Sequence, residues 1–269
     1  MSAEMVEILR QNSRTFFLPI MRLDGPLRDT VAAYYLANRA LDEIEDHPRI
    51  AAGDKAALLR GISRLLQQGS FSGADTERLF RPYATDLAPV THRFHDWAVT
   101  FPPNEIAPRL WDSLAALADR MADWVAADFR IHDEKDLDRY TFAVASAIGL
   151  TLSDLWNRHA GIVTPQPEAV AFGRAVQAAN ITWNRADDLA RGVDFFPAGW
   201  STRDMCGYVR RQLPGAWAYV EAVPAGHQVR DFCGITLDIC TTTLAAMEQG
   251  TQVDRAAITA IAARYAGRD

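Results

Sequence analysis

A carboxylate-rich segment near the N-terminus has the spacing of a metal site. Residues 38–46 read Asn-Arg-Ala-Leu-Asp-Glu-Ile-Glu-Asp. On a helix, Asp42 and Asp46 would lie on one face about 5–6 Å apart, with Glu45 beside them. Like charges at this spacing destabilise a helix, most of all at its negative C-terminal end. Mg²⁺ would relieve the repulsion, since it prefers carboxylate, water and phosphate oxygens. Arg39, one turn earlier, could face the same anionic ligand.

The same spacing has a second interpretation, in which the segment is simply an acidic helix end in water. Asp119 and Asp123 are also four residues apart, on a helix that we expect to be ordinary. Spacing alone therefore leaves both interpretations open.

A second polar segment has helical spacing as well. Four side chains share one helix stripe, at positions i, i+4, i+7 and i+8: Asn180, Asn184, Asp187 and Asp188. Asparagine can ligate a hard cation through its carbonyl oxygen, although less tightly than a carboxylate does. Alternatively, the stripe is a surface face on which Arg185 and Arg191 pair with the two aspartates.

Helices must position these segments, and the pattern of the chain is helical almost throughout. Period-2 alternation is scarce, and no Asn-Gly or Asp-Gly hairpin signal occurs. We predict an all-α chain organised as a single domain over residues 1–269. The predicted helices, separated by Pro- and Gly-containing breaks, span 26–46, 54–68, 104–130, 136–160, 166–194, 201–221, 226–248 and 253–266. Region 69–96 mixes Gly, Pro and polar residues, which predicts short helices or a flap.

The composition excludes several classes of protein. With 49% hydrophobic and 10% aromatic residues, the chain is not dominated by disorder. A net charge of −6 argues against a nucleic-acid partner. Three cysteines without a CxxC pair fit a reducing compartment. The longest uncharged apolar stretch, 140–153, is shorter than the ~18 residues that span a bilayer. We expect a cytoplasmic protein, with peripheral membrane contact and the oligomeric state left open.

Taken together, four segments resemble the motifs of the squalene/phytoene synthase family, the head-to-head trans-isoprenyl diphosphate synthases. Residues 13–16 resemble the early SRSF-like segment of the family, and 34–46 resemble its first aspartate-rich motif, YxxxRxxDxxxD. Residues 138–149 resemble the YCxxVAGxVG helix. Residues 177–197 resemble the second aspartate-rich motif, QxxNIxRDxxEDxxxGRxYxP. The motifs follow in the family order, and the similarity extends over residues 10–250.

The resemblance implies a fold, a reaction and a set of site residues. The fold would be an isoprenoid-synthase helical bundle around a central apolar pocket. The reaction would be the Mg²⁺-dependent ionisation of allylic prenyl diphosphates, C15 foremost, and the head-to-head joining of two of them with diphosphate release. The implied metal ligands are Asp42, Glu45, Asp46, Asn180, Asn184, Asp187 and Asp188. The implied substrate-binding residues are Ser13, Arg14, Tyr35, Arg39, Gln177 and Asn180. The implied catalytic residues are Tyr140, near the carbocation, with Asp42 and Asp46.

Departures from the family pattern keep three functions open. Trp183 and Asn184 stand where the family has Arg-Asp, and residues 192–197 lack the arginine of GRxYxP. Ser146 replaces the first glycine of VAGxVG, which would narrow the approach of a neighbouring helix or ligand. The chain could join two prenyl diphosphates into a C30 or C40 product, or stop at the cyclopropyl intermediate. It could instead be a class I-type terpene synthase, cyclase or prenyltransferase acting on a single prenyl diphosphate. Thirdly, it could be a non-catalytic lipid-binding or assembly factor with the same fold.

Overall fold

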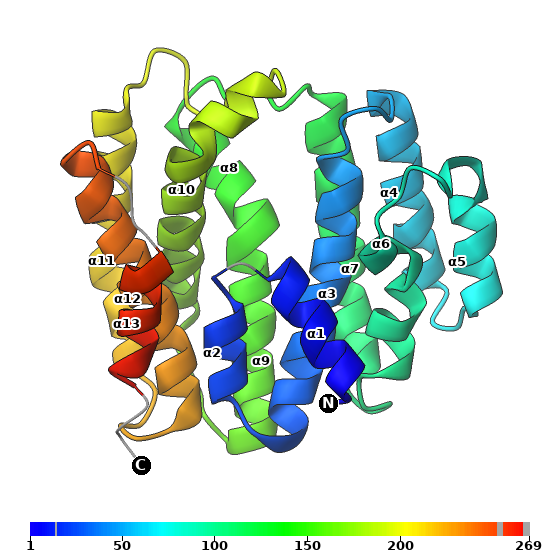
Figure 1. Cartoon of the computed structure of the whole chain (residues 1–269), viewed down its shortest axis with the longest axis horizontal. Helices are drawn as coiled ribbons and strands as arrows, with labels where there is room; N and C mark the ends of the chain where they lie inside the picture. The colour runs from blue at the N-terminus through cyan, green and yellow to red at the C-terminus, as the bar shows by residue number, and fades with distance from the viewer. Residues whose placement is uncertain (14, 252–254, 266–269) are drawn as a thin grey trace. The chain divides into compact units, whose positions relative to one another are not determined.

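Every regular element of the computed structural model is helical over the residues that it describes, 1–13, 15–251 and 255–265 (Figure 1). The α-helices are α1 (Ala3–Asn12), α2 (Phe17–Arg22), α3 (Gly25–Glu45), α4 (Ala52–Gln67), α5 (Gly73–Phe80), α6 (Pro89–His92), α7 (Ala107–Ala126), α8 (Glu134–Thr141), α9 (Ala147–Ala160), α10 (Gln166–Ala190), α11 (Thr202–Glu221), α12 (Gln228–Glu248) and α13 (Arg255–Ala263). A 3₁₀ turn, η1 (Arg81–Tyr83), and two π-helical turns, η2 (Asp96–Thr100) and η3 (Phe142–Ser146), complete the elements. The prediction of an all-α chain is confirmed. No helix within the described ranges combines the length and the apolarity needed to cross a membrane.

The chain divides into two compact units. Unit 1 comprises Met1–Arg14 and Gly25–Phe129, and unit 2 comprises Thr15–Asp24 and Arg130–Asp269. The organisation as a single domain over residues 1–269 stays a prediction.

Helix α3 forms the centre of unit 1. It packs against α1, α4, α6, η2 and α7, and α4 also lies along α7 (Figure 1). Its apolar side chains explain this position, because Leu27, Val31, Leu41 and Ile44 are all buried. The helix begins at Gly25, whose φ of +45° is a left-handed conformation that glycine adopts readily. Burial extends almost all round α3, and in its last turn Asp42 and Glu43 keep part of their surface exposed.

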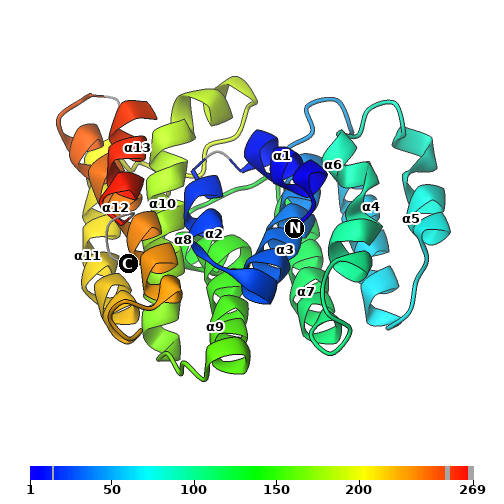
Figure 2. The same cartoon turned by 60° about the horizontal axis from the view of Figure 1, so that its bottom comes forward.

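Helix α10 has the corresponding place in unit 2. It packs against α8, η3, α9, α11 and α12, while α12 also contacts α2 and α13 (Figures 1 and 2). Side-chain caps set the starts of its neighbours. Asp133 accepts from the backbone N–H of Asp136 at the start of α8, and Ser201 and Asp204 form a capping box at the start of α11. Thus the polar residues of α8 and α10 belong to one packed unit.

The element boundaries differ from the sequence prediction in several places, and α7 is shorter at both ends than the predicted helix 104–130. The predicted helix 136–160 is three consecutive segments, α8, η3 and α9, and the predicted helix 166–194 ends at Ala190. Helices α1 and α2 were not predicted. Region 69–96 contains short helices, which is one of its two predicted forms. The last helix lies within the predicted 253–266, of which residues 253, 254 and 266 are outside the described ranges.

Candidate functional site

The last turns of α3 and Asp46, the residue directly after the helix, form the N-terminal acidic motif, defined here as residues 38–46. The backbone N–H of Asp46 donates to the carbonyl oxygen of Asp42 (2.8 Å), so these residues lie one helical turn apart, as predicted. Asp42 is partly exposed and Asp46 is exposed, whereas Glu45 is buried. The two outer carboxylates are therefore the ones that a ligand from solvent can reach.

Asp42 has a strongly perturbed carboxyl group. Burial among protein atoms raises the pKa of Asp42 to about 7, with Arg39 opposing the shift and Asp46 and Glu43 adding to it. The side chain still keeps 42% of its surface accessible, so the carboxyl group is recessed but reachable. A cation beside Asp42 would favour its ionised form. Perturbed carboxyl groups of this kind concentrate at functional sites.

Arg39 is held on the same face by two carboxylates. It forms an ion pair with Glu43, and its Nη1 lies 3.5 Å from Asp42 Oδ2. Glu43 was not among the predicted site residues, although its i+4 spacing from Arg39 is the usual signal of such a pair. Tyr35, also on α3, donates from its hydroxyl group to the carbonyl oxygen of Asn12 (3.4 Å) and so ties α3 to α1.

Asp119 and Asp123, the other pair of aspartates four residues apart, lie on α7 and contact side chains of a neighbouring helix. Asp123 pairs with Arg60 (2.9 Å), and Asp119 accepts a hydrogen bond from Ser63 (2.8 Å). Both partners belong to α4, so these carboxylates join two helices of unit 1. The expectation of an ordinary helix at this position is confirmed.

The C-terminal polar motif, defined here as residues 177–197, occupies the second half of α10 and the loop after it. The side-chain amide of Asn184 donates to Asn180 Oδ1 (2.8 Å) and to the backbone oxygen of Asn180 (3.0 Å). Gln177 is partly buried and Asn180 is exposed. The two asparagines therefore lie together as the stripe predicted, but they bond to each other.

The two aspartates of this motif have different surroundings. Asp187 is exposed, whereas Asp188 is buried and pairs with Arg191 at 2.5 Å. The surface interpretation of the stripe predicted this pair. Its other pair is wrong, because Arg185 contacts Asp194 instead (2.8 and 3.2 Å). Asp194 lies in the loop after Ala190, which folds back so that this carboxylate contacts Arg185.

Tyr140, the predicted catalytic tyrosine, lies in α8 and is buried. Its ring stacks on Phe195, with centroids 4.8 Å apart and planes 20° apart. Phe195 belongs to the loop after α10, so this stacking places the predicted tyrosine beside the C-terminal polar motif within unit 2. An aromatic face can stabilise a nearby cation.

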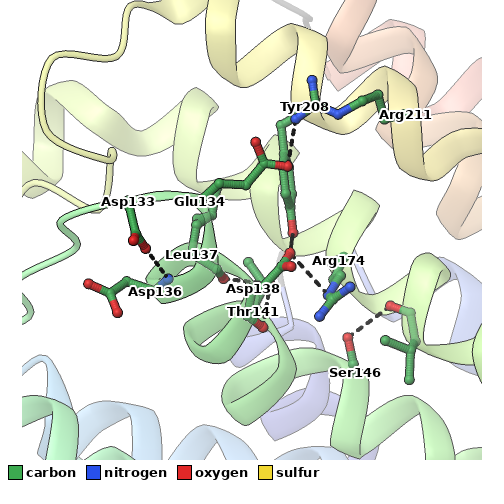
Figure 3. Close-up of polar contacts among 11 residues, drawn as sticks. Asp133, Glu134, Asp136, Leu137, Asp138, Thr141, Ser146, Arg174, Tyr208 and Arg211 are labelled. Carbon is green, nitrogen blue, oxygen red and sulfur yellow. Dashed lines mark hydrogen bonds and ion pairs between the residues drawn. The ribbon is translucent and has the colours of Figure 1, made fainter.

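A polar cluster that the sequence did not reveal anchors the same helix (Figure 3). Tyr208 of α11, fully buried, donates to Asp138 Oδ1 (2.6 Å). Arg174 Nε of α10 lies 3.4 Å from the same oxygen. Asp138 is two residues before Tyr140, so the carboxylate joins three helices next to the predicted catalytic residue. Burial and the hydrogen bond to Asp138 raise the pKa of Tyr208 far above its ordinary value, and the hydroxyl group stays a donor.

Ser146, which replaces a family glycine, is accommodated by a glycine on α10. Its hydroxyl group donates to the carbonyl oxygen of Val170 (2.9 Å). A Cβ atom on Gly173 would lie 2.5 Å from Ser146 Cα. In the family pattern a glycine at position 146 allows a close approach. Here Gly173 of α10 allows η3 and α10 to approach closely at Ser146.

The early segment is described only in part. Ser13 is fully buried, and its hydroxyl oxygen makes no hydrogen bond with the described residues. Arg14, a predicted substrate-binding residue, lies outside the described residues. The roles predicted for both residues stay predictions.

The two motifs differ in the groups that they offer to a divalent cation. Within the described residues, no three His, Cys, Asp or Glu side chains are grouped so as to hold a metal ion. Mg²⁺, however, is commonly held by one or two carboxylates together with water and substrate phosphates. Asp42 and Asp46 offer two such carboxylates, and both can be reached from solvent. In the polar motif, Asn180 Oδ1 accepts a hydrogen bond from Asn184, and Asp188 is paired with Arg191 at 2.5 Å, closer than the 3.5 Å between Asp42 and Arg39.

Comparisons with known proteins identify relatives of this chain. A family model described as squalene/phytoene synthase matches residues 9–205. The chain is 28% identical to squalene synthase of Homo sapiens over 195 residues, which cover 70% of this chain and 45% of that protein. It is 35% identical to squalene synthase BSS of Botryococcus braunii over 196 residues, which cover 71% and 36% respectively. The chain spans about half the length, or less, of these curated relatives.

Solved structures establish the fold. The complex of TcSQS with the ligand E5700 superposes with a TM-score of 0.77 at 20% identity, covering 96% of this chain and 84% of that one. A dehydrosqualene synthase in complex with a ligand gives a TM-score of 0.58 at 16% identity, covering 97% and 94%. The chain therefore has the all-α isoprenoid-synthase fold, as predicted. Because the family model matches well over half of its length, the chain belongs to the squalene/phytoene synthase family.

Proposed function

We propose that this chain is a Mg²⁺-dependent prenyltransferase that condenses two allylic prenyl diphosphates head to head. The observation that carries the proposal is the N-terminal acidic motif in a member of this family. Asp42, with a pKa of about 7, and the exposed Asp46 follow Arg39 on one side of α3. The C15 diphosphate is the proposed substrate, in keeping with the squalene synthases that the chain matches.

In the proposed reaction, the bond between C1 and the diphosphate oxygen of one substrate breaks. The double bond of the second substrate then forms a carbon–carbon bond with the allylic cation, and loss of a proton gives a cyclopropylcarbinyl diphosphate. When bound, Mg²⁺ neutralises the leaving diphosphate. Asp42 and Asp46 would hold the ion, and Arg39, fixed by Glu43, would donate charge-assisted hydrogen bonds to diphosphate oxygens. The buried ring of Tyr140 would face positive charge.

The C-terminal polar motif favours a second candidate, a terpene synthase that ionises a single prenyl diphosphate. Asn184 is bonded to Asn180, and Asp188 is paired with Arg191. A chain with one diphosphate site would cyclise its substrate, add water to it, or transfer it to another acceptor. We propose the cytoplasm as the location for either reaction, with peripheral contact with a membrane that takes up an apolar product.

Incubation with C10, C15 and C20 all-trans prenyl diphosphates tests these proposals. The reaction is run with Mg²⁺ and with EDTA, the released diphosphate is measured, and the organic extract is analysed by mass spectrometry. A Mg²⁺-dependent C30 or C40 product supports head-to-head condensation. A Mg²⁺-dependent product with one prenyl chain supports the second candidate. Absence of diphosphate release from every substrate contradicts both, and favours a non-catalytic lipid-binding or assembly factor.

A further inference from the structure

The first observation concerns the two asparagines of the C-terminal polar motif. Asn184 Nδ2 lies 2.8 Å from Asn180 Oδ1 and 3.0 Å from the Asn180 backbone oxygen. Two acceptors surround this atom, so the nitrogen must occupy the position, because an oxygen there would be repelled. Asn184 Nδ2 thus takes part of the acceptor capacity of the Asn180 oxygen, and Asn184 can offer a cation only its own Oδ1.

The second observation concerns the last acidic residue of the motif. Asp188 keeps only 11% of its side chain exposed, and Arg191 Nη2 lies 2.5 Å from its Oδ1. Arg191 is placed by the end of α10, because its backbone N–H donates to the Asp188 carbonyl oxygen (3.0 Å) and Gly192 follows with φ +83°. A divalent ion at Asp188 would have to displace a guanidinium group that the helix end itself delivers.

The third observation is that the loop after α10 is fastened. Arg185 makes two hydrogen bonds with Asp194 and lies 3.7 Å from the centre of the Phe196 ring. The backbone N–H of Phe196 donates to the same carboxylate (3.1 Å). Residues 180–194 contain three carboxylates and two arginines, whereas residues 38–46 contain four carboxylates and one arginine. Two of the three carboxylates, Asp188 and Asp194, are therefore paired with arginines of the same segment, and Asp187 is exposed.

We propose that the C-terminal polar motif of this chain binds no divalent cation, and that Arg191 supplies the positive charge beside Asp188. Divalent cations then bind through the N-terminal acidic motif alone. This last part rests on the proposed function, while the statement about the polar motif rests on its own contacts. The chain would differ from a synthase with two metal-binding motifs in the number of ions that it holds.

Binding of Mn²⁺ in the presence of inorganic diphosphate, measured by calorimetry and by electron paramagnetic resonance, tests the proposal. The variants are Asp42→Asn, Asp188→Asn and Asn184→Ala. We expect Asp188→Asn and Asn184→Ala to keep the wild-type stoichiometry, with dissociation constants within about threefold of wild type. Asp42→Asn should weaken binding at least about tenfold, the smallest loss typical even of residues that support metal ligands.

Loss of a bound ion, or a tenfold weaker affinity, in Asn184→Ala or Asp188→Asn would overturn the proposal. If Asp188→Asn fails to fold, Asn184→Ala decides, because alanine is favourable at this partly exposed helix position. A wild-type chain that binds no Mn²⁺ would contradict the metal dependence in the proposed function, and would support the metal-free polar motif.

Discussion

Replacing Tyr208 with phenylalanine tests whether the carboxylate of Asp138 anchors α8. The substitution removes one buried hydroxyl group and leaves the ring. That hydroxyl group donates to Asp138 at 2.6 Å, and a hydrogen bond to a charged group contributes about 1.5–3 kcal/mol. Asp138 keeps 34% of its side chain exposed and retains Arg174 at 3.4 Å, so water and Arg174 offset part of the loss. We expect Tyr208→Phe to cost about 1–2 kcal/mol.

The assay is thermal unfolding followed by circular dichroism. For a chain of this size, each kcal/mol lowers Tm by about 2–4 °C, so the expected fall is about 2–8 °C. Tyr83→Phe is the matched control, because the Tyr83 hydroxyl group also interacts with a carboxylate, that of Asp54, but the side chain is only partly buried. An unchanged Tm in Tyr208→Phe, or an equal fall in Tyr83→Phe, would refute the reasoning.

Three further changes have outcomes that follow from the structure. Gly173→Ala should lower the stability of the chain by about 1–3 kcal/mol in urea unfolding, because the new Cβ would meet the backbone of Ser146 at 2.5 Å. Arg191→Gln should lower the stability by about 1–2 kcal/mol, because the ion pair with Asp188 is lost. The cost is smaller than for a fully buried pair, since Arg191 keeps 31% of its side chain exposed. Mn²⁺ affinity in calorimetry should fall about tenfold from pH 8 to pH 6, because ligation needs an ionised carboxylate and Asp42 has a pKa of about 7.

Two control variants and one contradicting result accompany these predictions. Gly53→Ala, where a new Cβ meets nothing within 4 Å, should not destabilise α4. Arg10→Gln breaks an exposed pair with Glu7 and should have little effect. An affinity for Mn²⁺ that is constant between pH 6 and pH 8 would contradict the raised pKa of Asp42. The same shift affects folding: the protonated carboxyl group favours the folded state, and this contribution is lost as the pH rises from about 4 towards 7.

Local punctuation in the sequence predicted most helices well. Proline and glycine positions placed α3, α11 and α12 within two residues of their observed ends, because these residues act on the backbone where they stand. The π-helical turn η3 could not be predicted from the sequence, because one extra residue in a turn leaves the spacing of the apolar residues almost unchanged. The end of α10 was placed four residues too late because Gly192 lies within a helical polar pattern.

In the candidate site too, contacts set by local helix spacing were predicted from the sequence, and contacts between distant segments were not. The spacing of Asp42 and Asp46, and the pair between Arg191 and Asp188, follow from helix geometry and were predicted. The contacts of Asp138 with Tyr208 and of Arg185 with Asp194 were not, because they depend on how segments distant in sequence, or a loop, fold back. Residue types therefore indicated the chemistry of the site, and the packing of α8, α10 and α11 determined which carboxylates already have partners.

The central claim, that two prenyl chains are joined, is tested most directly with a mixture of isotopes. Purified protein is incubated with Mg²⁺ and equal amounts of unlabelled and deuterium-labelled C15 prenyl diphosphate, and the products are analysed by mass spectrometry. We predict a Mg²⁺-dependent product that contains one labelled and one unlabelled chain, absent with Asp42→Asn. Products that are either fully labelled or fully unlabelled, each with a single prenyl chain, would contradict head-to-head condensation.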